Sequence, residues 1–502
     1  MPNYFTIPQD VLFFRDARPM TANTGSGGHG ARWPEPSIIF DALHAALHRA
    51  FPVPDEMTRD AATFQSFIKE QQWDWQHPHR YITRPKATGT RNRQPDEKFR
   101  NQRFGALTTT GPFPAVRQNG NNFPTLWLFP APADYVPHET VARPYLSPLR
   151  DGGGQTNLPA PFLHPLANPC EPSKAEAPPW WSKAAIEAAL KNQFPSQSDL
   201  WQKSELYAEE WTTGIGIDPA SQTQDGEHIY SAQYLRLRDE IAIGFNASLP
   251  TGAPDAPEGF KNLFPANELI ICGGQQRACR VAPLPSGVQL KDLLPVGQVD
   301  KLQACSDGKW RIKWLLLSPA VFPFVSETSP GGWLPNWIAA RNGEDHGRPF
   351  QAGDVLLKPE IPPKQPGESR EVWRKRVARE LPPISARLVA ARVPKPNVVT
   401  GWTERLQILA HAANCEAEQT QEYAPDKGAR PTLLAVPAGA VYYFETDHEQ
   451  DARTLANALN WHGVPAARDF GQAIQNRRST LMGEKGFGLG VCGTWDFLEN
   501  GH

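Results

Sequence analysis

Proline most constrains what this chain can fold into, because 51 of its 502 residues are proline. That share is about twice the usual one. Proline lacks a backbone N–H and clashes with the preceding helical turn, so it ends or kinks a helix and interrupts the middle of a sheet. A chain this rich in proline cannot consist mainly of long helices. We therefore expect strands joined by many ordered loops.

Composition and patterning exclude several broad classes of protein. Hydrophobic residues make up 40% of the chain and charged residues 21%, which is typical of a globular protein. No apolar run reaches the roughly 18 residues that would span a bilayer, and residues 1–4 do not resemble the start of a signal peptide. Six cysteines are too few for a disulfide scaffold. We expect a reduced, cytoplasmic protein without a cofactor or a bound metal.

The spacing of apolar residues predicts mixed strands and helices. The chain opens with strand patterns over 4–7 and 11–14, a glycine-rich loop over 17–30, and a helical pattern over 37–51. Further expected strands are 104–109, 126–129, 229–237, 241–245, 268–272, 311–317, 385–393, 433–444 and 487–491, and further expected helices are 183–190, 368–380 and 451–460. Because regular βαβ spacing is absent, this pattern predicts an α+β fold.

Two segments stand out by composition. Residues 130–202 are thick with proline and tryptophan and are predicted to be an insertion packed on the surface. Residues 80–103 contain eight Lys or Arg against two acids, a local charge of +6 within a chain of net charge −2. This basic loop could bind a polyanion or simply be solvated, and the sequence leaves both interpretations open.

A glycine-rich segment near the end of the chain invites two interpretations. Residues 488–493 match G-x-G-x-x-G, but a dinucleotide site needs that motif to open a helix inside a βαβ unit, and only nine residues follow it. The segment 483–490 is better explained as a loop whose backbone N–H groups approach a phosphate, with Lys485 inside it and Arg477 and Arg478 just before it. The alternative is a tight structural turn.

Other clusters of reactive residues give weaker evidence for a functional site. His44 and His48 share a helix face, but Ala45 stands where a zinc-protease motif needs its glutamate. Cys272 and Cys279 lack a second close pair for a zinc cluster and are predicted to be buried thiols. The charged helix 368–380 is predicted to be a solvated face. Neither a nucleophile-elbow motif nor a P-loop is present in the sequence.

A series of short motifs, in fixed order, carries a resemblance to a known family. The first covers 10–19, the glycine-rich loop to His29, and 34–43; the later ones are 111–113 with 129–132, 214–218, 229–230 with 235–237, 273–274 with Arg277, 332–335, 401–402, 436–444 and 486–489. Together they resemble the third-subunit family of the Cmr complex, the type III-B CRISPR effector, within the RAMP superfamily of RNA-binding proteins. Each motif is weak alone, but their order over nearly the whole chain is specific.

The resemblance implies a fold and a function. The fold would be two ferredoxin-like (RRM-like) domains: 1–295, with a Pro- and Trp-rich insertion at about 130–205, and 296–502, ending in the glycine-rich loop that is the signature of the superfamily. The function would be antiviral defence. Family members bind the repeat-derived 5′ tag of the guide RNA (crRNA), pack against the large polymerase-like subunit and the backbone RAMP subunit, and are not thought to cleave RNA.

Three glycine-rich turns with basic residues attached are the candidate RNA contacts. The expected residues are Arg15, Arg18, Gly27, Gly28 and His29 in the first turn, Gly273, Gly274 and Arg277 in the second, and Arg477, Lys485, Gly486 and Gly488 in the third. Backbone amides and basic side chains suit phosphates, while aromatic and guanidinium planes suit unstacked bases. We expect the three turns to line one groove.

Two alternative functions remain open at the level of sequence. One is a metal-independent endoribonuclease of the same superfamily that processes CRISPR precursor RNA, for which His29 is the candidate general acid or base. The other is an enzyme acting on a small phosphorylated metabolite, which is supported only by the glycine-rich loops and the abundance of proline and tryptophan.

Overall fold

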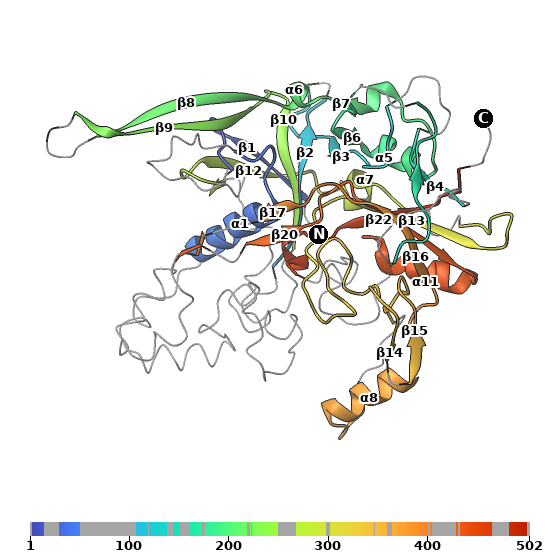
Figure 1. Cartoon of the computed structure of the whole chain (residues 1–502). Coiled ribbons are helices and arrows are strands. Elements are labelled where there is room, and N and C mark those ends of the chain that lie inside the picture. The colour runs from blue at the N-terminus through green and yellow to red at the C-terminus, as the bar shows by residue number, and fades with distance from the viewer. Residues whose placement is uncertain are drawn as a thin grey trace. The chain divides into compact units, whose positions relative to one another are not determined.

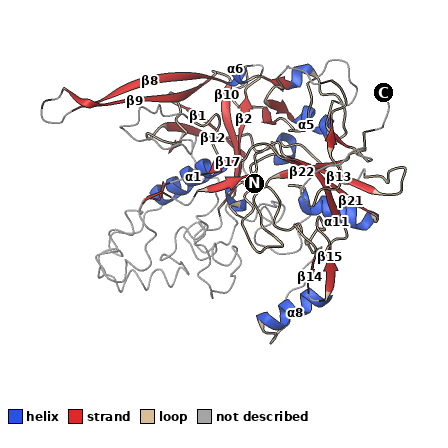
Figure 2. Cartoon of the chain, in the orientation of Figure 1, coloured by secondary structure: helices blue, strands red, loops and turns tan. Residues whose placement is uncertain are grey.

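Two compact units make up the chain. The computed structural model describes residues 3–14, 30–50, 107–118, 120–137, 144–150, 161–171, 176–217, 221, 223–248, 268–297, 302–345, 347–358, 364–380, 382–399, 402–403, 428–429, 432–463 and 481–498. Unit 1 consists of 1–124, 206–289 and 398–433, and unit 2 of 125–205, 290–397 and 434–502. Figure 1 labels their elements, and Figure 2 shows that strands and loops predominate over helices in both.

Unit 1 contains five neighbouring antiparallel strands of one sheet. They are β1 (Asn3–Pro8), β2 (Thr108–Val116), β10 (Ile241–Ser248), β11 (Glu268–Ile271) and β12 (Ala278–Pro283). Their order is β11-β12-β1-β10-β2, and Thr6 of β1 lies opposite Ile243 on one side and Val281 on the other. Helix α1 (Pro36–Ala50) lies in the connection from β1 to β2 and buries Ile39, Leu43 and Leu47, as the helical spacing predicts.

The strand expected over 104–109 is displaced to β2. Pro112 and Pro114 lie inside β2, although proline is expected to end a central strand. Pro114 pairs with Ile243 of β10 in regular register, whereas Pro112 lies where the register shifts, between the pairs Phe113–Gly244 and Thr110–Asn246. Proline is tolerated at such an irregularity, because the ladder of hydrogen bonds is already interrupted there. β2 therefore continues past both prolines.

Two long strands of unit 1 form a hairpin that extends beyond the sheet (Figure 1). They are β8 (Tyr207–Ile217) and β9 (Gln224–Leu237), paired from Tyr207–Leu237 to Ile217–Gln224. We call this hairpin the arm. The sequence predicted β9 but missed β8, whose Glu and Gly residues weaken the strand pattern.

Unit 2 is built on a second antiparallel sheet. Its strands are β13 (Trp310–Leu316), β16 (Arg387–Arg392), β21 (Val441–Thr446) and β22 (Gly490–Gly493), in the order β16-β21-β13-β22. Helix α11 (Glu449–Leu459) lies in the connection from β21 to β22 and buries Leu455 and Leu459. Trp314 packs against Tyr442 and Trp337 in the core in tilted ring contacts, with centroid distances of 5.5 Å and 5.6 Å.

The strand expected over 433–444 is divided in two. β20 (Leu433–Ala435) ends before Pro437, and β21 begins at Val441. Gly439 between them has a φ of 88°, and a Cβ there would lie 2.4 Å from the carbonyl oxygen of Ala131. A residue with a side chain would not fit this turn, so the chain changes direction where the hydrophobic pattern alone predicted one continuous strand.

The Pro- and Trp-rich segment is not a surface insertion. It forms β6 (Trp180–Ser182), β7 (Leu200–Trp201) and α5 (Lys183–Ala189), and β6 pairs with β7 and with the preceding strand β3 (Leu126–Pro130). Tyr145 and Trp181 are among the largest fully buried side chains of the chain. The aromatic residues that mark this segment therefore form part of the core of unit 2.

Most of the remaining elements are short. They are β4 (Ser147–Pro148), β5 (Leu166–Ala167), η1 (Gln197–Asp199), α6 (Lys203–Leu206), α7 (Leu290–Leu293), β14 (Gly343–Asp345), β15 (Arg348–Phe350), α8 (Arg370–Glu380), β17 (Asn397–Val399), β18 (Trp402–Thr403), β19 (Gly428–Ala429) and η4 (Gly483–Lys485). Within the described ranges, no helix combines the length and apolar character needed to cross a membrane.

The units do not follow the boundary expected at residue 295. Unit 2 takes 125–205 from the expected first domain, and unit 1 takes 398–433 from the expected second. One reason is visible inside unit 2, where buried Lys313 of β13 donates through Nζ to the carbonyl oxygen of Ala189 and to Oδ1 of Asn192, both at 2.9 Å. Such long-range contacts leave no trace in linear composition.

Candidate RNA interface

The second predicted turn is a tight connection between β11 and β12. The N–H of Cys272 donates to the carbonyl of Arg277 at 2.8 Å, which closes the turn. Gly273, Gln275 and Gln276 all have positive φ, of 80°, 56° and 50°. A Cβ on Gly273 would lie 2.6 Å from the carbonyl oxygen of Phe13, so glycine is required there on two grounds. The thiols of Cys272 and Cys279 are buried beside this turn, as predicted.

The second predicted turn packs against the segment 10–14. The N–H of Gly274 donates to the carbonyl of Phe13 at 2.8 Å, and the N–H of Ala31 donates to the carbonyl of Phe14 at 2.6 Å. Phe14 and Ala31, which flank the first glycine-rich loop in the sequence, therefore lie beside the turn at Gly274. Arg15, Arg18, Gly27, Gly28 and His29 lie outside the described residues, as does the basic loop 80–103.

Arg277 occupies the end of this turn and rests on an aromatic ring. Its guanidinium carbon lies 4.9 Å from the ring centroid of Tyr234, and its Nη2 donates to Oε1 of Gln275 at 3.3 Å. The hydroxyl of Tyr234 donates to the same Gln275 oxygen. With a side-chain exposure of 29%, Arg277 is held in place on one side and open to solvent on the other. A guanidinium held in this way can bind a phosphate or stack on a base.

A second guanidinium lies beside the first. Nη1 of Arg236 in β9 is 3.2 Å from Oδ1 of Asp10, while Nη1 of Arg277 is 3.6 Å from Oδ2 of the same carboxylate. Arg236 also forms a two-pronged hydrogen bond with Glu210, which lowers the pKa of the Glu210 carboxyl below its ordinary value. We call Asp10, Glu210, Arg236 and Arg277 the arginine cluster. The sequence pointed to Arg277 alone, because nothing in the pattern brings the other three together.

The arm also carries exposed aromatic and aliphatic side chains, on the face opposite to the arginine cluster. Trp211 and Ile215 of β8 are 54% and 50% exposed and lie on one face of the hairpin. The opposite face packs Ala232 and Tyr234 of β9 against Val11 and Phe13. Because its inward face is buried, the arm is fixed at its base. Trp211 is a candidate stacking residue that sequence reasoning missed; only the alternation within β8 could have indicated it.

The third predicted turn is a packed structural element. Lys485 is 5% exposed, and the whole loop from Met482 to Gly493 is buried. The N–H of Gly488 donates to the carbonyl of Pro319 at 2.7 Å, and Ser318 Oγ donates to the carbonyl of Gly486 at the same distance. In this conformation the loop's amides are engaged with the protein, because Ser318 and Pro319 cross over it. This corrects the interpretation of the loop as an open phosphate cradle; Arg477 lies outside the described residues.

The residues that were predicted to line one groove are therefore divided between the two units. The turn at Gly273, Gly274 and Arg277 belongs to unit 1, together with the two ends of the first glycine-rich loop. Lys485, Gly486 and Gly488 belong to unit 2. The part of the site that the structure assembles is the arginine cluster with its neighbouring aromatic residues.

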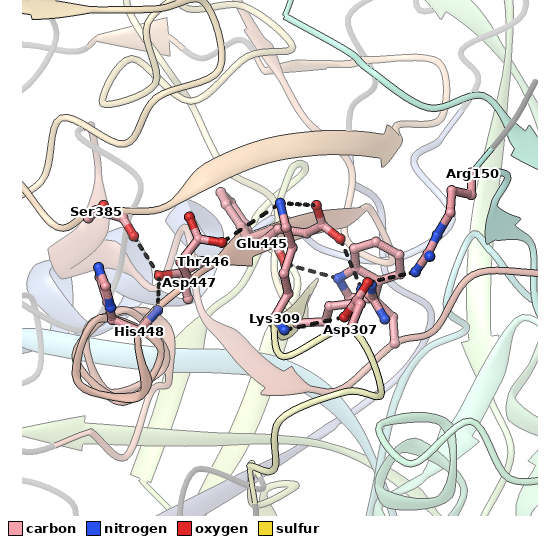
Figure 3. A network of polar contacts seen from close by, with 11 residues as sticks. Arg150, Asp307, Lys309, Ser385, Glu445, Thr446, Asp447 and His448 are labelled. Carbon is pink, nitrogen blue, oxygen red and sulfur yellow. Dashed lines mark hydrogen bonds and ion pairs between the residues drawn. The ribbon is translucent and has the colours of Figure 1, made fainter.

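Charged groups in unit 2 mostly satisfy one another. Arg311 is 3% exposed, donates from Nε to Glu445 Oε1 at 2.9 Å, and lies 4.6 Å from the ring of Phe497. Figure 3 shows neighbouring members of this network, in which Lys309 contacts Glu445 and Arg150 contacts Asp307. Because these charged groups pair with one another, the network favours a structural role over RNA binding. Among the described residues, no group of histidine, cysteine or acidic side chains has the arrangement of a metal site.

Comparison with known proteins identifies relatives of the whole chain. A family model described as CRISPR-associated protein (Cas_Cmr3) matches residues 5–495. Two solved structures of Type III-B Cmr-beta bound to cognate target RNA, one of them also with AMPPnP, contain a chain that is similar at TM-score 0.35, with 11% identity for the AMPPnP structure and 12% for the other, covering 88% of this chain and 86% of that one. A chain of the Csm3-Csm4 subcomplex of the type III-A interference complex is similar at TM-score 0.29 and 8% identity, covering 88% and 92%. No curated protein sequence matches.

Proposed function

The chain belongs to the Cas_Cmr3 family of CRISPR-associated proteins, and we propose that it binds the guide RNA of a type III-B effector, holding the repeat-derived 5′ tag without cleaving it. The observation that carries this proposal is the pair of solvent-accessible guanidiniums of Arg236 and Arg277, which lie on either side of the Asp10 carboxylate. Paired guanidiniums bind phosphate oxygens through several N–H groups at once.

Aromatic residues near the cluster support a role in holding single-stranded RNA. Unstacked bases bind to aromatic and guanidinium planes, and this mode tolerates sequence variation. The guanidinium of Arg277 rests on the ring of Tyr234 on one side and is open to solvent on the other. A phosphate at Arg236 and a base stacked on Arg277 would together hold a short segment of strand.

The sheet topologies support the proposed ferredoxin-like character of both units. In unit 1 the strands β12-β1-β10-β2 lie in the order last, first, third, second along the chain, with α1 in the first connection. In unit 2 the strands β22-β13-β21-β16 follow the same order, with α11 in the last connection. A split βαβ arrangement of this kind is the ferredoxin-like motif.

The proposed partners are other subunits of the effector. By the same family membership, we infer that the chain packs against a large polymerase-like subunit and a backbone RAMP subunit in the cytoplasm. Purification of the chain from cells carrying its effector genes tests this directly. We expect these two proteins to co-purify together with short RNAs that share one 5′ end; RNAs with random ends would contradict the proposal.

The test of the RNA site removes both guanidiniums. We expect Arg236→Ala with Arg277→Ala to weaken binding of a tag RNA about a hundredfold and to reduce the slope of log K against log salt by about 1.4, since each phosphate contact to single strands contributes about 0.7. Fluorescence anisotropy over a salt series measures both quantities. The matched control is Arg341→Ala with Lys375→Ala, which removes two exposed cations of unit 2 that pair with exposed Glu327 and Glu371. Equal affinities for the two double variants would exclude the arginine cluster.

A separate assay addresses catalysis. We expect repeat RNA incubated with the full chain in the absence of metal to remain intact. Appearance of a 2′,3′-cyclic phosphate product that is lost on His29→Ala would instead favour the endoribonuclease alternative, in which a side chain near the RNA acts as general acid or base.

A further inference from the structure

The carboxylate of Asp10 bridges the two guanidiniums that the proposed function assigns to RNA. Its two oxygens divide between them, with Oδ1 3.2 Å from Arg236 and Oδ2 3.6 Å from Arg277. Asp10 is 57% exposed and lies between the end of β1 and the segment that packs on Tyr234. The carboxylate therefore sits at the solvent side of the cluster, where a phosphate approaching either guanidinium would arrive.

The arginine cluster is electrically balanced before any ligand binds. Arg236 and Arg277 contribute two positive charges, and Asp10 and Glu210 contribute two negative ones. Carboxylate and phosphate oxygens compete for the same guanidinium N–H groups, because both accept hydrogen bonds from the planar guanidinium fork. An RNA phosphate can bind both guanidiniums fully only if Asp10 gives up its contacts.

Neither arginine needs Asp10 to stay in position. Arg277 is held by Gln275 and by the ring of Tyr234, and Arg236 is held by Glu210. Removing the Asp10 carboxylate would therefore free N–H groups without releasing the side chains that carry them. Asp10 differs in this respect from Glu210, which supports one arginine through two hydrogen bonds.

We propose that Asp10 is an internal competitor of RNA phosphate, which lowers the affinity of the arginine cluster for any RNA backbone until a correctly placed strand displaces it. This inference rests on the proposed function, since it assumes that Arg236 and Arg277 contact RNA. It gives the free chain a means of limiting indiscriminate binding to polyanions. The effect acts on phosphates, so it is independent of base sequence.

The test is the charge-removing, shape-conserving substitution Asp10→Asn in the full chain. We expect affinities for a tag RNA and for a scrambled RNA of equal length to rise together, by about three- to tenfold, as expected for loss of two exposed ion pairs. The control is Asp239→Asn in the turn between β9 and β10, which removes the same charge from unit 1; Asp239 is exposed and forms no ion pair with the described residues. We expect that variant to change affinity less than twofold.

Asp10→Asn in a chain that lacks both arginines distinguishes failure of the competitor role from failure of the proposed RNA site. In the Arg236→Ala, Arg277→Ala background, Asp10→Asn is expected to have no effect, because the groups that it competes for are gone. A rise in affinity there, or a fall or no change in the otherwise wild-type chain, would overturn the competitor role while leaving the RNA site in place. If the two arginine substitutions themselves leave RNA binding intact, it is the proposed site that fails.

Discussion

At the scale of single residues, Gly273 shows why a glycine-rich motif can be structural and functional at once. Its φ of 80° and the close approach of Phe13 both exclude a side chain, and the turn it forms presents Arg277. We expect Gly273→Ala to lower the free energy of unfolding by about 1–3 kcal/mol, the usual cost of a disfavoured backbone conformation. Chemical denaturation measures the change.

Gly287→Ala is the matched control for this prediction. A Cβ at Gly287 would meet no atom within 4 Å, and the residue does not have a positive φ. We expect its stability to stay the same or to rise slightly, because alanine restricts the unfolded chain more than glycine does. A Gly273→Ala variant with the same free energy of unfolding as the Gly287→Ala variant would show that the turn tolerates a side chain.

His164 in unit 2 predicts a pH dependence of stability. Burial against neighbours that include the ring of Phe497, at 4.9 Å, lowers the pKa of His164 below its ordinary value of 6.5. As the pH falls through 6.5, the unfolded chain takes up a proton that the folded chain does not, so folding loses stability down to the lowered pKa. We expect His164→Gln to lose less stability than the wild type between pH 7 and 5.

Thermal unfolding at several pH values measures this difference. His448→Gln, which replaces an exposed histidine at the start of α11, serves as the control. We expect that variant to follow the pH dependence of the wild type. A His164→Gln curve parallel to that of the wild type would contradict the assignment.

At the scale of elements, α11 is a helix that is stabilised mainly by its packing on the core of unit 2. Its four buried residues, Ala452, Leu455, Ala456 and Leu459, recur at helical spacing and face the core of unit 2. We expect Leu455→Ala to destabilise the protein by about 2–5 kcal/mol, since the change leaves a cavity in a filled core. Arg453→Ala, which removes an exposed ion pair with Glu449, should change stability by no more than about 0.5 kcal/mol. Denaturant titration of both variants compares them.

At the scale of the whole molecule, the interleaved units predict that the halves of the chain do not fold separately. Lys313 belongs to 296–502, but the groups that satisfy its ammonium, Asp134 among them at 3.4 Å, belong to 125–205. Leaving this buried cation without partners costs about 3–5 kcal/mol. We expect fragment 296–502 expressed alone to lack a cooperative unfolding transition.

Co-expression of fragments 1–295 and 296–502 is the control for that experiment. Because every contact of unit 2 is then available, we expect the two fragments to co-purify and to unfold cooperatively, as followed by tryptophan fluorescence. A cooperative transition of 296–502 alone would instead support two sequential domains with a boundary at 295.

Much of the fold was predictable because local patterns act over a few residues. The helix expected over 37–51 is α1 at 36–50, and the strand expected over 311–317 is β13 at 310–316. Periodicity succeeds there because the core face of each element repeats within its own sequence. It fails at 433–444, where close approach of a distant carbonyl to Gly439 forces a turn.

The candidate site divides in the same way. Residue types alone indicated Gly273, Gly274 and Arg277, since glycine marks unusual backbone and arginine marks anion binding. Tertiary contacts alone decided that Lys485 is buried and that Asp10 lies between two arginines drawn from distant segments. The physical reason is that the strength of a charge depends on its solvation and its neighbours, and both are set by residues far away in the chain.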